Sequence, residues 1–228
     1  MAAQVGSITE FKGDVTLQKG NKTVKVQAAP TPLDEKDIVV TGPKGRARIT
    51  LTDGSTLSLG ASSHFSVTSY HFETSGRIQA KLSVSDGGFR AVTGKIGKLA
   101  PSRFTVKTAT ATIGIRGTDF AGIVSPSGDT IACVGGAIGV AGSSGAPVTV
   151  AAGSITSVAP GKTPTAPRAY TPDEINNLLT VAGMEKDEIQ NLLSPKEANA
   201  TKQEDASGPK KAPNQATPTA PNRGPVKF

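Results

Sequence analysis

Hydrophobic and polar residues alternate over short stretches along most of the chain, and turn-forming residues separate these stretches. In segment 46–51 basic and polar residues alternate with apolar ones, and the Asp53-Gly54 pair that follows is typical of a hairpin turn. This alternation predicts strands with one buried and one solvated face. The strands expected before residue 108 are 5–10, 14–17, 24–26, the end of 33–42, 46–51, 55–59, 65–72, 77–84, 89–93 and 104–107.

The same rhythm continues after residue 120, with strands expected at 123–124, 130–134, 137–140, 148–150 and 154–158. Turns rich in glycine recur every several residues, which favours rungs that stack on one another. The chain is rich in Gly, Thr, Ser and Val and poor in aromatic residues, so its core should be thin. The predicted fold class is therefore all-β, a solenoid-like β-sandwich of short strands.

The stretch 108–120, TATATIGIRGTDF, is the most informative part of the sequence. Its β-branched residues predict a strand, and the closely spaced Gly114 and Gly117 predict a bulge or tight corner. Arg116 and Asp119 lie three residues apart across that corner, so an ion pair between them is expected. We interpret Gly114, Arg116, Gly117, Thr118 and Asp119, together with Asp53 and Gly54, as a structural motif. The stretch lacks the helices of a KH loop and the Lys-Ser/Thr of a phosphate loop, so nucleic acid is not an expected partner.

Two short helices are predicted near residue 180. Thr171, Pro172 and Glu174 form a complete helix start, and the unit DEINNLL at 173–179 returns as DEIQNLL at 187–193. Such short helices need to bury their apolar stripes. The stripes could cap an open end of the sheet within the same chain, or they could form a docking site. The residues concerned are Ile175, Leu178, Leu179, Ile189, Leu192 and Leu193.

These patterns divide the chain into a β-domain at 1–165, a linker with a helical hairpin at 166–195, and a disordered tail at 196–228. No apolar run is long enough to be a transmembrane segment. The Ala2-Ala3-Gln4 start is similar to the residue left after signal-peptide cleavage, with Met1 added. A periplasmic or secreted location is therefore expected.

The net charge of +7 is unevenly distributed. No acidic residue lies between Asp86 and Asp119, whereas that interval contains the bases Arg90, Lys95, Lys98, Arg103, Lys107 and Arg116. This basic stripe could contact an anionic surface, or it could pair with the acidic helices of the same chain.

Residues suited to catalysis or metal binding are few. His64 and His71 are seven apart and would face opposite sides of a strand, so no metal site is predicted. The acidic residues Asp34, Asp53, Asp86 and Asp129 stand in predicted turns, where turn chemistry accounts for them. Cys133, the single cysteine, is expected to be buried and inert. We therefore expect no enzymatic activity and no cofactor.

Four segments together resemble the FecR domain: VVTGPKGRA at 39–47, LTDGS at 51–55, FRAVTGK at 89–95 and, most specifically, TATIGIRGTDF at 110–120. The resemblance covers roughly 5–161 and implies a non-enzymatic, all-β, extracytoplasmic domain of bacterial envelopes. In the regulators that gave the family its name, this domain follows an anti-sigma segment and a membrane helix, and it receives a signal from an outer-membrane receptor. This chain resembles a stand-alone form without those segments. It departs from the family at Lys36, where Gly is common before Asp37, and at Gly135, where an acidic residue is usual.

Two hypotheses of function follow. The first is a signal-related interaction module that docks an envelope protein. The second is a structural or adhesive envelope component that the basic stripe and the tail hold to an anionic cell-surface polymer.

Overall fold

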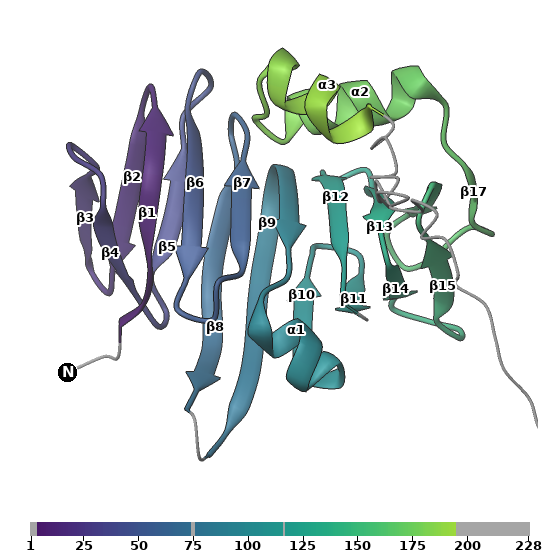
Figure 1. Cartoon of the computed structure of the whole chain (residues 1–228), viewed down its shortest axis with the longest axis horizontal. Coiled ribbons are helices and arrows are strands. Elements are labelled where there is room, and N and C mark those ends of the chain that lie inside the picture. Colours follow the sequence, from purple (N-terminus) through teal and green to yellow (C-terminus); the bar gives the residue numbers. More distant parts are fainter. Residues whose placement is uncertain (1–3, 74–75, 116, 195–228) are drawn as a thin grey trace, which may run out of the picture. The chain divides into compact units, whose positions relative to one another are not determined.

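The structure is a computed structural model that describes residues 4–73, 76–115 and 117–194. Its strands form two sheets that face each other, and after the first four strands the chain advances along them from one end to the other (Figure 1). Sheet A contains, in order, β4 (Thr31–Asp34), β1 (Gln4–Lys12), β6 (Arg46–Leu51), β7 (Thr56–Leu59), the end of β9 (Ile78–Val92), β12 (Asp119–Val124), β13 (Asp129–Gly135), β16 (Ser154–Val158) and β17 (Arg168–Ala169).

Sheet B contains, in order, β3 (Lys22–Lys25), β2 (Val15–Lys19), β5 (Ile38–Thr41), β8 (His64–Phe72), the beginning of β9, β10 (Phe104–Lys107), β11 (Thr112–Ile115), β14 (Ala137–Ala141) and β15 (Val148–Ala151). Hairpins alternate between the sheets, since β10–β11 lies in sheet B, β12–β13 in sheet A, β14–β15 in sheet B and β16–β17 in sheet A. The predicted all-β sandwich with solenoid-like winding is confirmed.

One continuous core fills the space between the sheets. Its largest members are four phenylalanines, and two of them, Phe89 and Phe120, meet edge to face with ring centroids 5.9 Å apart. Most of the remaining core side chains are Val, Ile, Leu and Ala from the alternating positions of the strands. The alternation in the sequence therefore located the buried faces correctly.

Strand β9 differs from the prediction. Residues 86–88 were expected to be a turn between two strands, but β9 continues from Ile78 to Val92 and changes sheets there, pairing with β8 before this point and with β7 after it. Gly87 has a φ of +87°, and a Cβ on it would lie 2.2 Å from the Ser63 hydroxyl oxygen. The glycines therefore bend the strand between sheets without reversing it.

Three short elements were not predicted: strand β4, strand β17 and a helical segment made of α1 (Lys95–Leu99) and the 3₁₀ turn η1 (Pro101–Arg103). Strand β4 contains Pro32 and lies at the edge of sheet A, where a missing amide is tolerated. A helix of five residues is too short to be stable alone, so tertiary contacts must hold α1.

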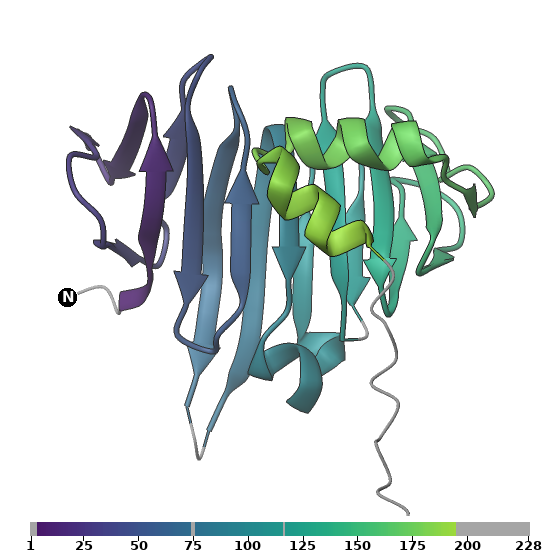
Figure 2. The same ribbon diagram turned by 45° about the horizontal axis from the view of Figure 1, so that its top comes forward.

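Both predicted C-terminal helices are present as α2 (Pro172–Val181) and α3 (Lys186–Leu193). Thr171 caps α2, and Glu174 completes the expected capping box. The helices lie across the outer face of sheet A, as Figure 2 shows. There they form a second apolar cluster with side chains of β12, β13 and β16.

Glycines permit the close approach of α2 to sheet A. A Cβ on Gly60 would lie 1.7 Å from the Val181 carbonyl oxygen, and one on Gly88 would lie 2.3 Å from the same atom. The α2–α3 connection then turns at Gly183, whose φ is +85°. The sequence prediction of a disordered tail at 196–228 concerns residues outside those that the structure describes.

Candidate functional site

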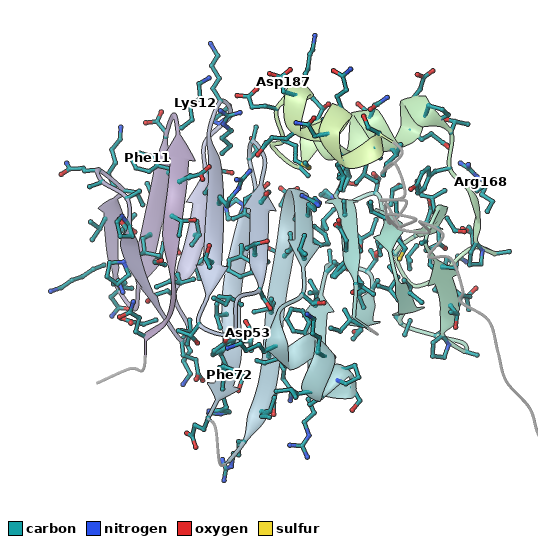
Figure 3. All side chains as sticks on the ribbon, viewed as in Figure 1. Phe11, Lys12, Asp53, Phe72, Arg168 and Asp187 are labelled. Carbon is teal, nitrogen blue, oxygen red and sulfur yellow. The ribbon has the colours of Figure 1, made fainter. Side chains whose placement is uncertain are left out.

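Asp53 fastens α1 to the sandwich. The Asp53 side chain is buried in the β6–β7 turn and accepts hydrogen bonds from the Ser55 amide (3.0 Å), the Ser55 hydroxyl (2.8 Å) and the Tyr70 hydroxyl (3.1 Å). It also accepts one from the amide of Ile96 in the first turn of α1 (3.1 Å), while the Asp53 carbonyl oxygen accepts from the Lys95 amide (2.9 Å). Figure 3 labels Asp53 beside α1. The turn predicted from sequence is thus also the anchor of an unpredicted helix.

Burial affects the neighbouring groups of this anchor. Desolvation raises the pKa of Tyr70 well above its ordinary value, so this hydroxyl remains a proton donor to Asp53. Ile96 is the residue of α1 whose side chain is fully buried in the core. Because α1 is held both by the Asp53 hydrogen bonds and by Ile96, its outer residues occupy a fixed position.

The outer side of α1 is basic and partly apolar. Lys95 and Lys98 are exposed, and Leu99 keeps 66% of its surface exposed. Four further exposed bases continue this surface over η1 and the neighbouring strands β9 and β10. We call the whole surface the basic end, and it consists of Arg77, Lys81, Lys95, Lys98, Leu99, Arg103 and Lys107.

No described acidic side chain pairs with the bases of the basic end. Within the described part of the chain, no carboxylate oxygen lies within 4.0 Å of any of their cationic nitrogens. Arg77, Lys81 and Arg103 line one shallow hollow of about 390 Å³ together with Ile78 and Thr105. Uncompensated cations gathered at one end produce a positive potential that attracts anionic groups.

Arg90, the first base of the predicted stripe, does not belong to the basic end. It lies on the outer face of sheet A and forms a bidentate ion pair with Asp119, over 2.9 Å and 2.7 Å. Both side chains are less than one-fifth exposed. Asp119 therefore has a partner that the sequence spacing did not indicate, because the two residues meet through the pairing of β9 with β12. Arg116 lies outside the described residues.

The rest of the 108–120 stretch forms the expected corner between the sheets. Strand β11 ends at Ile115 in sheet B and β12 begins at Asp119 in sheet A, and Gly117 has a φ of +65°. The Thr118 carbonyl oxygen accepts hydrogen bonds from the Thr93 amide (3.0 Å) and hydroxyl (3.1 Å). These contacts fix the corner to the end of β9. Gly114, on the outer face of sheet B, pairs with Gly139.

Asp129 is a second buried aspartate whose carboxylate accepts hydrogen bonds from a neighbouring hairpin. One of its oxygens accepts hydrogen bonds from the Thr110 amide (3.2 Å) and from the hydroxyls of Thr110 and Thr108. These contacts join the β12–β13 hairpin of sheet A to the β10–β11 hairpin of sheet B. Asp53 and Asp129 therefore both hold separate hairpins together.

The apolar stripes of the helices are used within the chain. Ile175, Leu178, Leu179 and Ile189 are buried in the cluster on sheet A, and Leu192 and Leu193 are partly buried there. The acidic face of α3 forms ion pairs with sheet A, between Glu185 and Arg46 and between Glu188 and Arg48. Hydrogen bonding to the Glu185 amide and to Arg48 lowers the pKa of Glu188. The ion pairs found for the acidic helices thus join Glu185 and Glu188 to β6 and Glu174 to Arg168 of β17, and none of them involves the basic end.

The described residues offer few groups suited to metal binding or to reactions of a thiol. They contain no group of three or more His, Cys, Asp and Glu side chains placed to hold a metal ion. Cys133 is buried, and burial raises its pKa to about 11, which keeps it a thiol. None of the described helices has the length and apolarity needed to cross a membrane.

The two packed sheets, the hairpin corners between them and the buried aspartates of the turns define an all-β domain whose chain is wound progressively along both sheets. The FecR protein family matches residues 37–156, more than half of the 228-residue chain. The chain therefore belongs to the FecR family. No curated protein matches it.

Among solved structures, the fold is similar to two crystal structures of a candidate anti-sigma factor from Parabacteroides distasonis ATCC 8503, at 1.65 Å and 2.50 Å resolution. Both superpose with a TM-score of 0.51, at 14% and 13% sequence identity. The match covers 62% of this chain and 64% and 63% of those chains, so it spans less than two thirds of their length. At this identity the likeness concerns the fold.

Proposed function

We propose that this FecR-family chain is a non-catalytic interaction module of the bacterial envelope, located outside the cytoplasm and taking part in signalling. Family membership supports the proposal, as does the shared fold with a structure described as a candidate anti-sigma factor. The use of Asp53 and Asp129 as structural hydrogen-bond acceptors supports a role without catalysis.

The observation that carries the proposal is the basic end. Glu185, Glu188 and Asp119 are paired within the chain. By contrast, Lys95, Lys98 and Leu99 are exposed on a helix that Asp53 holds in place. A rigid, exposed and uncompensated surface is suited to recognition.

The test is crosslinking of the tagged full chain in the envelope of its native bacterium, followed by capture at low and high salt. One dominant protein partner in the envelope fraction, captured more weakly at high salt, is the expected result. Recovery from the cytoplasmic fraction alone would contradict the envelope location. The full chain is required, because removal of α2 and α3 would expose the apolar cluster on sheet A.

The second hypothesis is a structural or adhesive component held to an anionic polymer, and the unpaired cations of the basic end favour it. It predicts capture of polymer without a discrete protein, with full release at high salt. The same capture experiment therefore separates the two functions.

A further inference from the structure

We propose that the basic end is a contact site for anionic phospholipid membranes, with Leu99 entering the interfacial region and the surrounding cations lying on the lipid phosphates. This inference rests on the envelope location in the proposed function. It assigns a partner to a surface for which family membership provides none.

Leu99 is the first observation. It is 66% exposed, and Val24 at 52% is the other large hydrophobic side chain exposed in the described residues. Leu99 stands at the end of α1, whose opposite side is fixed by buried Ile96. Lys98 precedes it directly, so its apolar side chain is presented next to a cation. An exposed apolar residue beside lysines is typical of interfacial membrane contacts.

Additional apolar surface lies at the same end. Phe72 and Ile78 are paired residues of β8 and β9 and are only partly buried. Figure 3 places Phe72 at the same end of the sandwich as Asp53 and α1. Phe72 and Ile78 could therefore enter the membrane interface together with Leu99.

Charge is the second observation. The basic end contains six bases besides Leu99, and no described carboxylate lies within 4.0 Å of their cationic nitrogens. Glu73 is an exposed acid of the β8–β9 connection, and its carboxylate is directed toward Gly76. Clusters of four or more bases are characteristic of contacts with anionic lipids, and each contributes an attraction that falls off within a Debye length.

The composition favours lipid over a protein partner. Four of the six bases are lysines, which are depleted in protein interfaces, where arginine and aromatic residues are enriched. A lysine ammonium on a flexible stem suits a fluid array of phosphates, whereas arginine suits fixed bidentate partners. Three of these cations, Arg77, Lys81 and Arg103, line the same shallow hollow, where several lipid phosphates could be reached at once.

The chain contains no tryptophan, which permits a direct measurement of insertion. We would prepare the full chain with Leu99→Trp and, as a matched control, with Val24→Trp, since Val24 also lies between nearby lysines, Lys22 and Lys25. Vesicles of phosphatidylglycerol with phosphatidylethanolamine would be compared with vesicles of phosphatidylcholine. We expect a blue shift of the emission for Leu99→Trp with the anionic vesicles only, and none for Val24→Trp.

Affinity measured by co-sedimentation of the tryptophan-free chain completes the test. Lys95→Gln and Lys98→Gln should each weaken binding to the anionic vesicles about fivefold, and Leu99→Asn about tenfold. Lys22→Gln and Val24→Asn should leave binding unchanged. Far-UV circular dichroism would verify that every variant is folded.

Three results would overturn the inference. The first is the absence of binding to anionic vesicles. The second is binding that survives the combined replacement of Lys95, Lys98 and Leu99, which would place the contact elsewhere on the chain. The third is capture of an acidic protein that depends on these residues while vesicles do not bind, which would assign the surface to a protein. Capture of a protein partner by the triple variant would leave the proposed function intact.

Discussion

The Tyr70 hydroxyl donates a hydrogen bond to Oδ1 of Asp53 over 3.1 Å and accepts one from the Asp53 backbone amide over 2.8 Å. A side chain of β8 in sheet B thus closes the β6–β7 turn of sheet A. The same carboxylate accepts from the Ile96 amide of α1. Asp53 consequently connects both sheets to the helix that presents the basic end.

Replacement of Asp53 by Ala should lower the free energy of unfolding by about 3 kcal/mol, because several buried donors lose their acceptor. Tyr70→Phe should cost about 1 kcal/mol, and the double variant should lose less than the sum, since the residues share one hydrogen bond. Urea denaturation measures these differences. Tyr170→Phe is the control, because the Tyr170 hydroxyl has no hydrogen-bond partner among the described residues. Strict additivity of Asp53→Ala and Tyr70→Phe would contradict the proposed connection.

Gly60→Ala should weaken the attachment of α2, because the new Cβ would lie 1.7 Å from the Val181 carbonyl oxygen. We expect a loss of about 2–4 kcal/mol and earlier protease cleavage near α2. Gly139→Ala is the matched control in β14, where a Cβ would meet no atom within 4 Å. Its effect should stay within about 0.5 kcal/mol. Equal stability of the two variants would show that α2 does not need this close approach.

Lys36→Gly should stabilise the chain by about 0.5–1 kcal/mol. Lys36 has a φ of +72°, a left-handed conformation that costs a side-chain-bearing residue about 1–2 kcal/mol, and glycine removes this cost at a smaller entropic penalty. The position is the one at which the sequence departs from the glycine common in the FecR family. Lys22→Gly in the exposed strand β3 should instead be neutral or destabilising. Thermal unfolding distinguishes these directions.

Acidification should loosen the start of α2. Hydrogen bonds from Arg168 and from the Thr171 amide lower the pKa of Glu174 to about 2 from its ordinary value of 4.5. Because the folded pKa lies below the unfolded one, this stabilisation is complete above about pH 5 and is lost as the pH falls from 4.5 toward 2. Hydrogen-exchange protection of the first α2 amides should decrease over this window. The decrease should be absent in Glu174→Gln, and its persistence there would assign it to another group.

Local patterns predicted much of this fold. Alternation of apolar and polar residues located most strands, and Thr171 with Glu174 located the start of α2, because strand faces and helix caps depend on residues close in sequence. The pattern also predicted the corner near Gly117. Helix α1 escaped prediction because five residues carry no helical periodicity, and its main support, Asp53, lies more than forty residues away.

The candidate site was only partly visible in the sequence. The absence of acids between Asp86 and Asp119 indicated a basic stripe, and four of its bases, Lys95, Lys98, Arg103 and Lys107, are exposed at the basic end. Arg77 and Lys81 were missed, because they join the others only through the parallel pairing of β9 with β10. Leu99 was missed as well, since a single apolar residue has no pattern that distinguishes exposure from burial.

The sequence by itself determined the all-β class, the alternation of buried and solvated positions, the two C-terminal helices and the FecR resemblance, because each depends on residues adjacent in the chain. Tertiary structure alone decided which charges are paired. Arg90 meets Asp119 across β9 and β12, and Glu185 and Glu188 meet Arg46 and Arg48. The bases of the basic end meet no described carboxylate. Ion pairing acts over a few ångströms of space, and only the folding of distant strands brings such groups within that range.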